Sequence, residues 1–474
     1  MPAGLGAEGL EGGLHGFFRG LLSREAGPIE VTDLERRASM LQVALGLIHP
    51  IRAALHAASV TSGRRIECPA MSTTLPDLHK LQADSDTRNT RLVGYHDLNG
   101  YGDGMQLVKN GPWLYVAHLG TSPMALSILD ASDPTNLKLV RQIEHPPNTH
   151  RHKVQVVGNV LIQNSEVPYF GDRSGSGPAP ITGLCVFKLD DPSDPQQIGF
   201  HAVPGNGVHR IWFSHMPYAH IAAWLPDARR RAYQIVDLSD PTRPTMAGSW
   251  WVPGSKDDDV ERWEPDISHS EIHGVIPYGN RAYASCIDAG FALLDISDIT
   301  APQALGRVNW YPPYGGYLHT SLPLPDRKLV VGVTEAIHPS EEADGDKRIW
   351  LIDVRNERQP VTISSFPKPR PPKGSPWGDS FWNRPLRFGP HNVHENRPNS
   401  FNSETLIFST WYNAGLRIHD ISDADRPTEV GHYVPPAPEG QKAPQINDVF
   451  VDADRLVYIT DRISGGVYVV EFTG

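Results

Sequence analysis

The stretch Leu129-Asp-Ala-Ser-Asp133 follows a run of apolar residues and returns, slightly varied, along the chain. The further copies are Leu189-Asp-Asp-Pro-Ser-Asp194, Val236-Asp-Leu-Ser-Asp240, Leu294-Asp-Ile-Ser-Asp298, Ile352-Asp-Val-Arg-Asn356 and His419-Asp-Ile-Ser-Asp423. Asp and Ser side chains at a strand end hydrogen-bond the backbone two residues further on, so each copy predicts a turn. Successive copies lie roughly 47–67 residues apart, which is typical of propeller blades.

Six such turns predict six blades, and the C-terminal residues predict a further one. Strands are expected at residues 449–451, 456–460 and 467–472, which leaves the last blade without an outer strand. The segment Arg91–His96 repeats the outer-strand pattern of Glu429–Tyr433 but precedes the first blade. We therefore predict an all-β fold, a seven-bladed β-propeller closed by an N-terminal strand that pairs with the C-terminal blade.

The N-terminal residues 1–70 differ in kind from the rest. They are rich in Gly, Ala, Leu and Arg and contain no copy of the repeat. The apolar stretch 41–60 carries His and Arg and is too polar for a membrane span, and it lacks the pattern of a secretory signal. We expect a poorly structured extension or a start-site artefact over residues 1–70, with a short amphipathic helix as the alternative, and the propeller over residues 71–474.

Composition narrows the class of protein. A formal net charge of −11 argues against a nucleic-acid partner, because phosphates require a basic surface. The three cysteines lie far apart without a CxxC motif, which fits a reducing cytoplasm and no disulfide framework. We therefore expect a cytoplasmic protein with no membrane partner, and the sequence leaves its oligomeric state open.

Five histidines recur at one position of five consecutive repeats, directly before a short apolar strand. They are His152, His209, His273, His319 and His391. In a closed ring one histidine per blade faces the axis, and converging neutral imidazoles are transition-metal ligands. Counting back from the turns places Gly104 and Asn447 at the same position in the first and last blades. The alternative is a water-filled polar channel lined by histidines without metal.

Carboxylates accompany these histidines. Glu166 and Glu335 each follow the second strand of a blade, where they can accept a hydrogen bond from the other ring nitrogen of a metal ligand. Glu271 lies two residues before His273 and is a candidate catalytic acid or base, and His150 is a second candidate at the pocket entrance. Each of these residues also has an ordinary interpretation as a loop or rim side chain.

Aromatic residues in the loops point to the type of substrate. Trp212 and Trp411, together with Asn447, are predicted to line a substrate pocket. The insertions 167–180 and 367–390 interrupt the repeat near the axial histidines and are candidate lids. An aromatic-lined mouth favours a small organic substrate, although blade packing also uses aromatic residues.

The repeated apolar-Asp-apolar-Ser-Asp turn resembles the LVIVD-repeat propellers, a bacterial and archaeal family. Longer strings resemble a large branch of that family with axial histidines, among them Val208-His-Arg-Ile-Trp212, Leu318-His-Thr-Ser-Leu322 and Phe388-Gly-Pro-His391. The resemblance implies the propeller fold but no particular activity, so function has to be argued from the site.

Three functions are compatible with this site. The leading hypothesis is a metal-dependent oxidoreductase, an Fe(II) oxygenase of the dioxygenase type that acts on a small aromatic or alkenyl compound, with Zn, Mn or Cu as alternative metals. Carotenoid-cleaving oxygenases, which are propellers with His-bound iron on the axis, offer an architectural analogy. The second hypothesis is a redox-neutral Zn or Mn lyase, isomerase or lactone hydrolase. The third is a non-enzymatic interaction scaffold.

Overall fold

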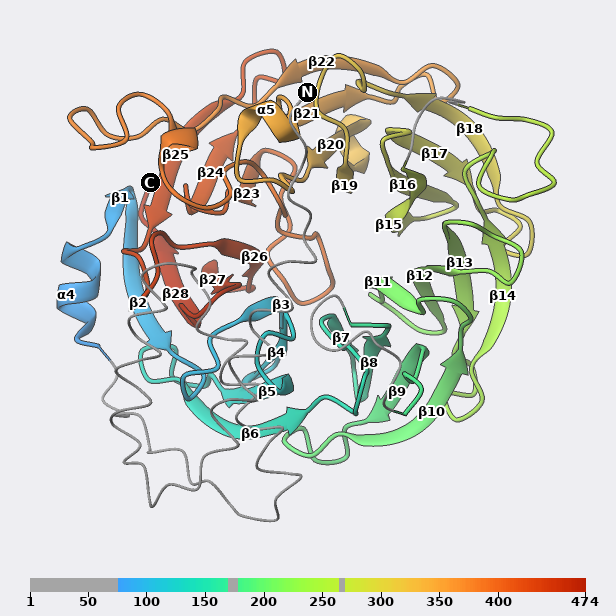
Figure 1. Ribbon diagram of the computed structural model, residues 1–474, viewed down its shortest axis with the longest axis horizontal. Coiled ribbons are helices and arrows are strands. Elements are labelled where there is room, and N and C mark those ends of the chain that lie inside the picture. Colours follow the sequence, from blue (N-terminus) through green and yellow to red (C-terminus); the bar gives the residue numbers. More distant parts are fainter. Residues whose placement is uncertain (1–75, 169–177, 264–268) are drawn as a thin grey trace, which may run out of the picture. The chain divides into compact units, whose positions relative to one another are not determined.

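Short antiparallel sheets make up nearly all of the regular secondary structure in the part of the chain that the computed structural model describes, residues 76–168, 178–263 and 269–474. The chain divides into two compact units, Met1–Glu67 and Cys68–Gly474. The first unit lies outside the described residues, so the predictions for residues 1–70 are not addressed by the structure. The same holds for most of the predicted lid at 167–180. Within the second unit the sheets follow one another around a common centre, which makes it a β-propeller (Figure 1).

Three sheets consist of four consecutive strands each. The first contains β3 (Gly104–Asn110), β4 (Trp113–His118), β5 (Met124–Asp130) and β6 (Lys138–Glu144). The second contains β7 (Val154–Val157), β8 (Val160–Ser165), β9 (Gly183–Lys188) and β10 (Gln196–Ala202). The third contains β11 (Val208–Trp212), β12 (Tyr218–Trp224), β13 (Arg231–Asp237) and β14 (Thr245–Trp250).

A larger sheet of eight strands follows. Its first half contains β15 (Ser270–Tyr278), β16 (Arg281–Ile287), β17 (Phe291–Asp295) and β18 (Gln303–Val308). Its second half contains β19 (Leu318–Leu324), β20 (Leu329–Thr334), β21 (Ile349–Asp353) and β22 (Val361–Ser365). A single residue pair, Ile287 with Leu318, joins the two halves.

The last two sheets combine strands from both ends of the described chain. One contains β23 (Leu406–Thr410), β24 (Leu416–Asp420), β25 (Thr428–Val434) and β1 (Asp86–Arg88). The other contains β26 (Ile446–Val451), β27 (Leu456–Asp461), β28 (Val467–Phe472) and β2 (Thr90–His96). In the second of these, Thr90 lies opposite Phe472 and His96 opposite Val467. The predicted strand Arg91–His96 therefore does pair with the C-terminal strand, whereas β1 was not anticipated.

The repeated Asp residues form the turns between the third and fourth strands. Asp130 accepts hydrogen bonds from the backbone N–H of Ser132 at 2.9 Å and from its hydroxyl at 2.6 Å. Asp237 accepts from the N–H of Ser239 at 2.7 Å and Asp295 from that of Ser297 at 2.8 Å. In the second sheet Asp191 rather than Asp190 plays this part. The predicted turn mechanism is thus confirmed, with a shift of one residue in that copy.

Glycines in the outermost strands let neighbouring sheets approach closely. A Cβ atom on Gly199, Gly248 or Gly306 would lie 2.1, 1.9 or 2.3 Å from a backbone carbonyl oxygen in the Asp turn of the next sheet. Gly94 in β2 makes the same approach, 2.0 Å from the carbonyl oxygen of Pro134, which lies in the turn of the first sheet. Strand β2 therefore contacts both the C-terminal sheet and the first sheet.

Helices are few in the described part of the chain, and the core lies between the sheets. The helices are α4 (Leu78–Ala83), α5 (Glu341–Asp344) and the 3₁₀ turns η1 (Pro325–Arg327) and η2 (Phe381–Asn383). None of them is long and apolar enough to cross a membrane. Cys185 and Cys286 are buried thiols without a disulfide.

Candidate metal centre

The five predicted histidines lie at the inner ends of the sheets. His209 is in β11, His273 in β15 and His319 in β19, while His152 lies just before β7 and His391 lies in a loop, two residues before the isolated bridge of Val393 with Ser409. In β11 and β19 the pairing register shifts at the histidine itself. Such a β-bulge leaves one residue unpaired and re-aims its side chain, which explains how the histidine turns away from the ladder.

The imidazole rings form one continuous cluster. Ring centroids are 5.3 Å apart from His152 to His209 and 4.9 Å from His209 to His273. They are 3.9 Å apart from His273 to His319 and 4.4 Å from His319 to His391. All except His209 are buried, and the side chain of His209 is only 12% exposed. The structure thus brings together all five residues that the repeat predicted.

Hydrogen bonds at Nδ1 fix the orientation of several rings. His273 Nδ1 lies 2.8 Å from the carbonyl oxygen of His319, and His391 Nδ1 lies 2.6 Å from that of Asn447. Because a carbonyl oxygen only accepts, Nδ1 carries the proton in both rings and Nε2 keeps its lone pair. His319 Nδ1 lies 2.8 Å from the hydroxyl of Thr320. That hydroxyl has its own acceptor, Asn392 Oδ1, at 3.2 Å, so His319 also donates from Nδ1.

The contact between His209 and His273 is chemically unusual. Their Nε2 atoms are 3.1 Å apart, while His209 Nδ1 lies 3.3 Å from a carboxylate oxygen of Glu166. With both Nδ1 atoms acting as donors, two Nε2 lone pairs face each other. Two nitrogens bound to one metal at the usual 2.0–2.1 Å lie about 2.8–3.4 Å apart. The spacing therefore suits a pair of ligands to one cation.

Glu335 lies on the Nε2 side of the cluster. Its carboxylate oxygens are 3.8 Å from His319 Nε2 and 3.6 Å from His391 Nε2. Together with His273 and His319 it forms a group whose ligand atoms lie within 4.8 Å of one another. The sequence predicted Glu335 as a support for a ligating histidine, and these contacts fit that role while also putting the carboxylate within reach of a cation held by His273 and His319.

Glu166 serves the other end of the cluster. Its carboxylate lies 3.0 Å from His152 Nδ1 and 3.3 Å from His150 Nδ1. His150 stacks on His152 with ring centroids 4.4 Å apart, and its Nε2 donates to the carbonyl oxygen of Leu119. Glu166, His150 and His152 form a second group with metal-binding spacing. Glu166 also contacts His209 Nδ1, which fits the supporting role predicted for this carboxylate.

Burial keeps the imidazoles neutral. It lowers the pKa of His209 to about 4, with Arg231 adding to the effect, and that of His391 to about 3. The pKa values of His152, His273 and His319 are also lowered, again mainly by burial. Neutral imidazole is the form that binds metal, so the cluster needs no deprotonation at pH 7.

The axial position in the first sheet is one residue later than predicted. The register shift in β3 falls between Gly104 and Gln106, so Met105 and not Gly104 occupies the position of the histidines. Asn447 is correctly placed by the shift in β26. Its side-chain amide donates to the carbonyl oxygen of Met105 at 2.6 Å. The prediction for Gly104 was wrong by one residue, because Met105 precedes the turn glycine Gly111 by the same six residues that separate His152 from Gly158 and His273 from Gly279.

Other predicted site residues have structural partners. Glu271 is buried and forms an ion pair with Arg231 at 2.8 Å. Burial raises its pKa, but Arg231 lowers it further, so the net shift is downward and the carboxylate stays ionised. Trp411 is fully buried in the core, and its indole N–H donates to Ser409. Trp212 is buried under the guanidinium of Arg397 at 4.3 Å. These contacts do not place either tryptophan in an open pocket.

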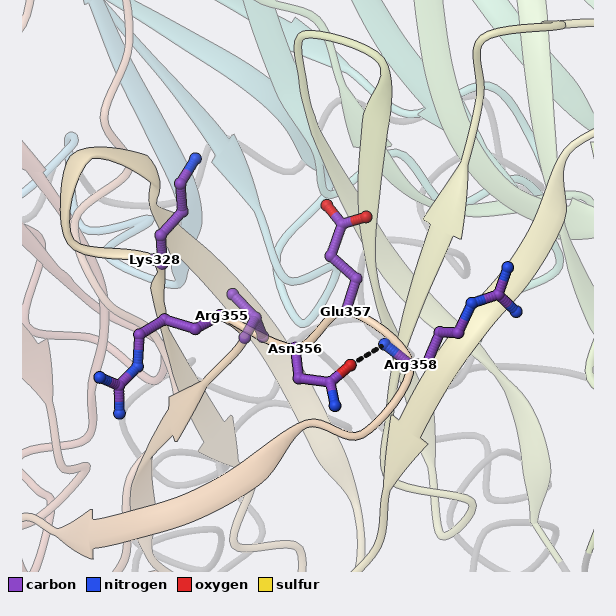
Figure 2. Close-up of a pocket in the computed structure, with 6 residues that line it drawn as sticks. Lys328, Arg355, Asn356, Glu357 and Arg358 are labelled. Atoms are coloured by element: carbon purple, nitrogen blue, oxygen red, sulfur yellow. Dashed lines mark hydrogen bonds between the residues drawn. The ribbon is translucent and has the colours of Figure 1, made fainter.

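A hollow in the outer surface lies at the turn between β21 and β22 (Figure 2). It is lined by Lys328, Val354 and the residues from Arg355 to Arg358. Arg355 pairs with Asp353 at 2.5 Å, and Glu357 accepts from Arg281 at 2.9 Å. The hollow belongs to the repeat turns and contains none of the clustered histidines.

Sequence reasoning missed several polar residues around the cluster. Tyr412 donates its hydroxyl proton to Glu335 at 2.8 Å, and Arg462 donates to the Tyr412 oxygen at 3.0 Å. Arg210, which directly follows His209, is buried and reaches Glu395 at 3.0 Å. The sequence did offer Arg210 as a residue near the axis, with packing between blades as the alternative, so of these residues Tyr412 and Arg462 were the ones missed.

The fold and the cluster define a β-propeller with a histidine-rich centre. The LVIVD repeat family model matches residues 101–144, 228–251 and 273–309, so this chain is an LVIVD-repeat protein. No curated protein matches it.

Solved structures resemble the chain at low identity. The N-terminal domain of Nup159 covers 81% of this chain and 95% of its own, with 12% identity and a TM-score of 0.49. A periplasmic gluconolactonase of Pseudomonas aeruginosa covers 81% and 96%, with 12% identity and a TM-score of 0.47. A functionally unknown protein from Desulfotomaculum acetoxidans covers 77% and 89%, with 12% identity and a TM-score of 0.44.

Proposed function

We propose that this protein is a metal-dependent oxidoreductase, an Fe(II) oxygenase that acts on a small aromatic or alkenyl compound. The observation that carries the proposal is the group formed by His273, His319 and Glu335, whose ligand atoms lie within 4.8 Å of one another. Two histidines and one carboxylate with open positions are the ligand set of non-haem Fe(II) oxygenases. An Fe(II) ion held by this set would supply dioxygen binding and activation.

The protein's own residues prepare this set. The carbonyl oxygen of His319 holds His273 in the tautomer that presents Nε2, and Thr320 does the same for His319. Tyr412 donates to Glu335, and Arg387 lies 3.8 Å from the same carboxylate. These contacts limit rotation of the ligands, so a cation would meet a nearly formed site.

His391 and His209 extend the set on either side. His391 Nε2 lies 3.6 Å from Glu335, and His209 Nε2 lies 3.1 Å from His273 Nε2. Either ring is a candidate further ligand. The burial of the cluster also supports an oxygenase, because a dry centre protects reactive species from water.

We also infer the finer architecture and location. The two halves of the eight-stranded sheet count as two blades, which gives seven blades in all. The pairing of β2 with β28 and the approach of Gly94 to Pro134 support closure by the N-terminal strand. Two buried free thiols support a reducing, cytoplasmic location.

A redox-neutral Zn or Mn enzyme is the second candidate. Two histidines and a glutamate also form the ligand set of catalytic zinc sites, and the group His150, His152 and Glu166 repeats that composition at the other end of the cluster. In this case the bound metal would act as a Lewis acid for a lyase or a lactone hydrolase.

Metal content decides between these candidates. Protein purified without an affinity tag would be analysed by inductively coupled plasma mass spectrometry, for wild type, the double variant His273→Ala/His319→Ala and the control His215→Ala. His215 is exposed and outside the cluster. Near-stoichiometric iron in wild type and in the control, lost in the double variant, would support the oxygenase.

The same measurement can refute the proposal. Zinc or manganese with the same dependence on His273 and His319 would favour the redox-neutral enzyme. Wild-type protein that holds no transition metal and cannot be reconstituted with one would refute both and leave an interaction scaffold.

A further inference from the structure

A second layer of buried polar residues lies directly behind the histidines. Its members follow the axial residues by one position in each sheet and are Gln106, Lys153, Arg210, Thr320, Asn392 and Asp448, with Gly274 as the seventh. All six residues are buried, with exposures between 0% and 6%. We refer to these residues as the polar layer.

The register shifts explain why consecutive residues both face inward. In a regular strand the residue after an axial histidine would point to the opposite face. In β11, β19 and β26 the ladder restarts only after the axial residue, so the next residue can also face inward. Gly274 leaves room for this layer, because a Cβ there would lie 2.8 Å from the side chain of Arg210.

Nearly every polar group of the layer has a partner. Asn392 donates to Asp448 at 2.7 Å and accepts from Arg210 at 3.4 Å. The second oxygen of Asp448 accepts from the backbone N–H of Leu107 at 3.0 Å. The charge of Arg210 is matched by Glu395 at 3.0 Å. The amide and carboxylate groups of Asn392 and Asp448 therefore have hydrogen-bond partners within or beside the polar layer.

Lys153 is the exception. Its side chain is fully buried, and Nζ donates a hydrogen bond to no described residue. It also forms no ion pair of 4.0 Å or less with a described carboxylate. A buried lysine amine without an acceptor leaves polar N–H groups unpaired, which costs free energy, so an anionic acceptor at this point would be stabilised.

The position of Lys153 connects it with the histidine cluster. It directly follows His152, so the two Cα atoms are about 3.8 Å apart.

We propose, building on the metal-dependent activity proposed above, that Lys153 binds the carboxylate group of a small anionic substrate whose reacting part lies against the histidine cluster. The unpartnered Nζ of Lys153 favours a single acceptor of opposite charge, and the surrounding polar layer holds the lysine side chain in place. This narrows the substrate class from small aromatic or alkenyl compounds to their carboxylic acids.

The test is carboxylate binding by the full-length protein. Benzoate and acrylate would be titrated by isothermal calorimetry, with nitrate as an inorganic anion and benzamide as an uncharged analogue. The variants are Lys153→Met and, as a control, Lys109→Met, which removes a lysine already paired with Asp452 at 3.1 Å. Metal content is measured in every sample.

The proposal predicts that wild type and Lys109→Met bind a carboxylate, that Lys153→Met binds it at least tenfold more weakly, and that benzamide does not bind. Binding of nitrate but of no carboxylate would indicate an inorganic anion site and overturn the substrate assignment. Equal carboxylate affinity in Lys153→Met and wild type would overturn the proposal, as would the absence of any carboxylate binding in wild type.

A second measurement does not depend on the variant folding. Wild-type crystals soaked in 4-bromobenzoate should show an anomalous bromine peak in the axial region and carboxylate oxygens within hydrogen-bond distance of Lys153 Nζ, and a ligand bound elsewhere would overturn the assignment. Carboxylate binding at Lys153 in protein that holds no metal would sink the proposed oxygenase but leave this site standing. Metal retention without carboxylate binding would overturn the carboxylate site but leave the proposed oxygenase standing.

Discussion

Replacing Gly94 by alanine tests whether the N-terminal strand holds the ring together. Gly94 lies in β2, and a Cβ atom there would be 2.0 Å from the carbonyl oxygen of Pro134 in the first sheet. Both sides of this contact are backbone, so no flexible side chain can move aside. Carbon and oxygen need roughly 3.2–3.4 Å, so strand and turn must separate by about 1.2–1.4 Å.

The expected loss of stability follows from this displacement. Overpacking of this kind costs about 1–3 kcal/mol, and the reduced backbone freedom of alanine in the unfolded chain returns about 0.4–1 kcal/mol. The net loss is at most about 2.6 kcal/mol. For a propeller of roughly 400 residues the entropy of unfolding is about 0.8 kcal/mol/K, so Tm should fall by up to about 3 °C.

The assay is scanning calorimetry at one scan rate, with two comparison variants. Gly248→Ala creates the same clash inside the chain, because its Cβ would lie 1.9 Å from the carbonyl oxygen of Ile299. Arg91→Ala changes an exposed side chain of β2, whose pair with Glu471 is worth little in water. Gly94→Ala and Gly248→Ala should both lower Tm, while Arg91→Ala should leave it nearly unchanged.

One result would refute the reasoning. If Gly248→Ala lowered Tm and Gly94→Ala did not, the contact between β2 and the first sheet would be absent from the folded protein. The ring would then be open between its first and last sheets.

Three further outcomes follow from the contacts of single residues. Glu271→Gln breaks the buried ion pair with Arg231, so the free energy of unfolding should fall by about 3–5 kcal/mol in denaturant titrations. The pH profile of turnover should not change. A shifted profile would restore Glu271 as a catalytic acid or base. Thr320→Val removes the acceptor of His319 Nδ1 and should weaken metal binding about 10–100-fold in chelator competition, and an unchanged affinity would contradict the tautomer assigned to His319. Burial lowers the pKa of His220 from 6.5 to about 3, so as the pH drops the unfolded chain binds a proton before the folded protein does, and stability falls from pH 6.5 toward pH 3. His220→Gln should reduce the slope of the free energy of unfolding against pH by up to about 1.4 kcal/mol per pH unit. An unchanged slope would show that His220 is not held neutral.

The sequence predicts the features that depend on local chemistry. The turn at Asp130 and its copies can be read from side chains that bind the backbone two residues on, and the structure contains those hydrogen bonds. The strand Arg91–His96 was found because its pattern matches another outer strand. The strand β1 was not, because three residues, Asp86–Arg88, carry too little periodicity to identify a strand.

The sequence identified the histidines of the candidate site, but it did not show which residues beside them face the same way. His209 and His319 were found from their common place in the repeat, and they do meet at the centre. Lys153 was missed because sequence rules assume that side chains alternate along a strand, and Met105 was missed because the count back from Gly111 was one residue too long. A bulge breaks that alternation.

The axial position itself argues that the histidines serve function rather than folding. The same bulged position is filled by Met105 in β3 and by Asn447 in β26, so the fold accepts an apolar or an amide side chain there. Imidazoles are a poor choice for packing a core, because each buried polar nitrogen needs a hydrogen-bond partner. The structure supplies partners for the Nδ1 atoms of His273 and His391 from backbone carbonyls and leaves their Nε2 atoms facing the centre. A site that fixes one nitrogen of each ring and turns the other toward neighbouring rings supports the cation site that we propose.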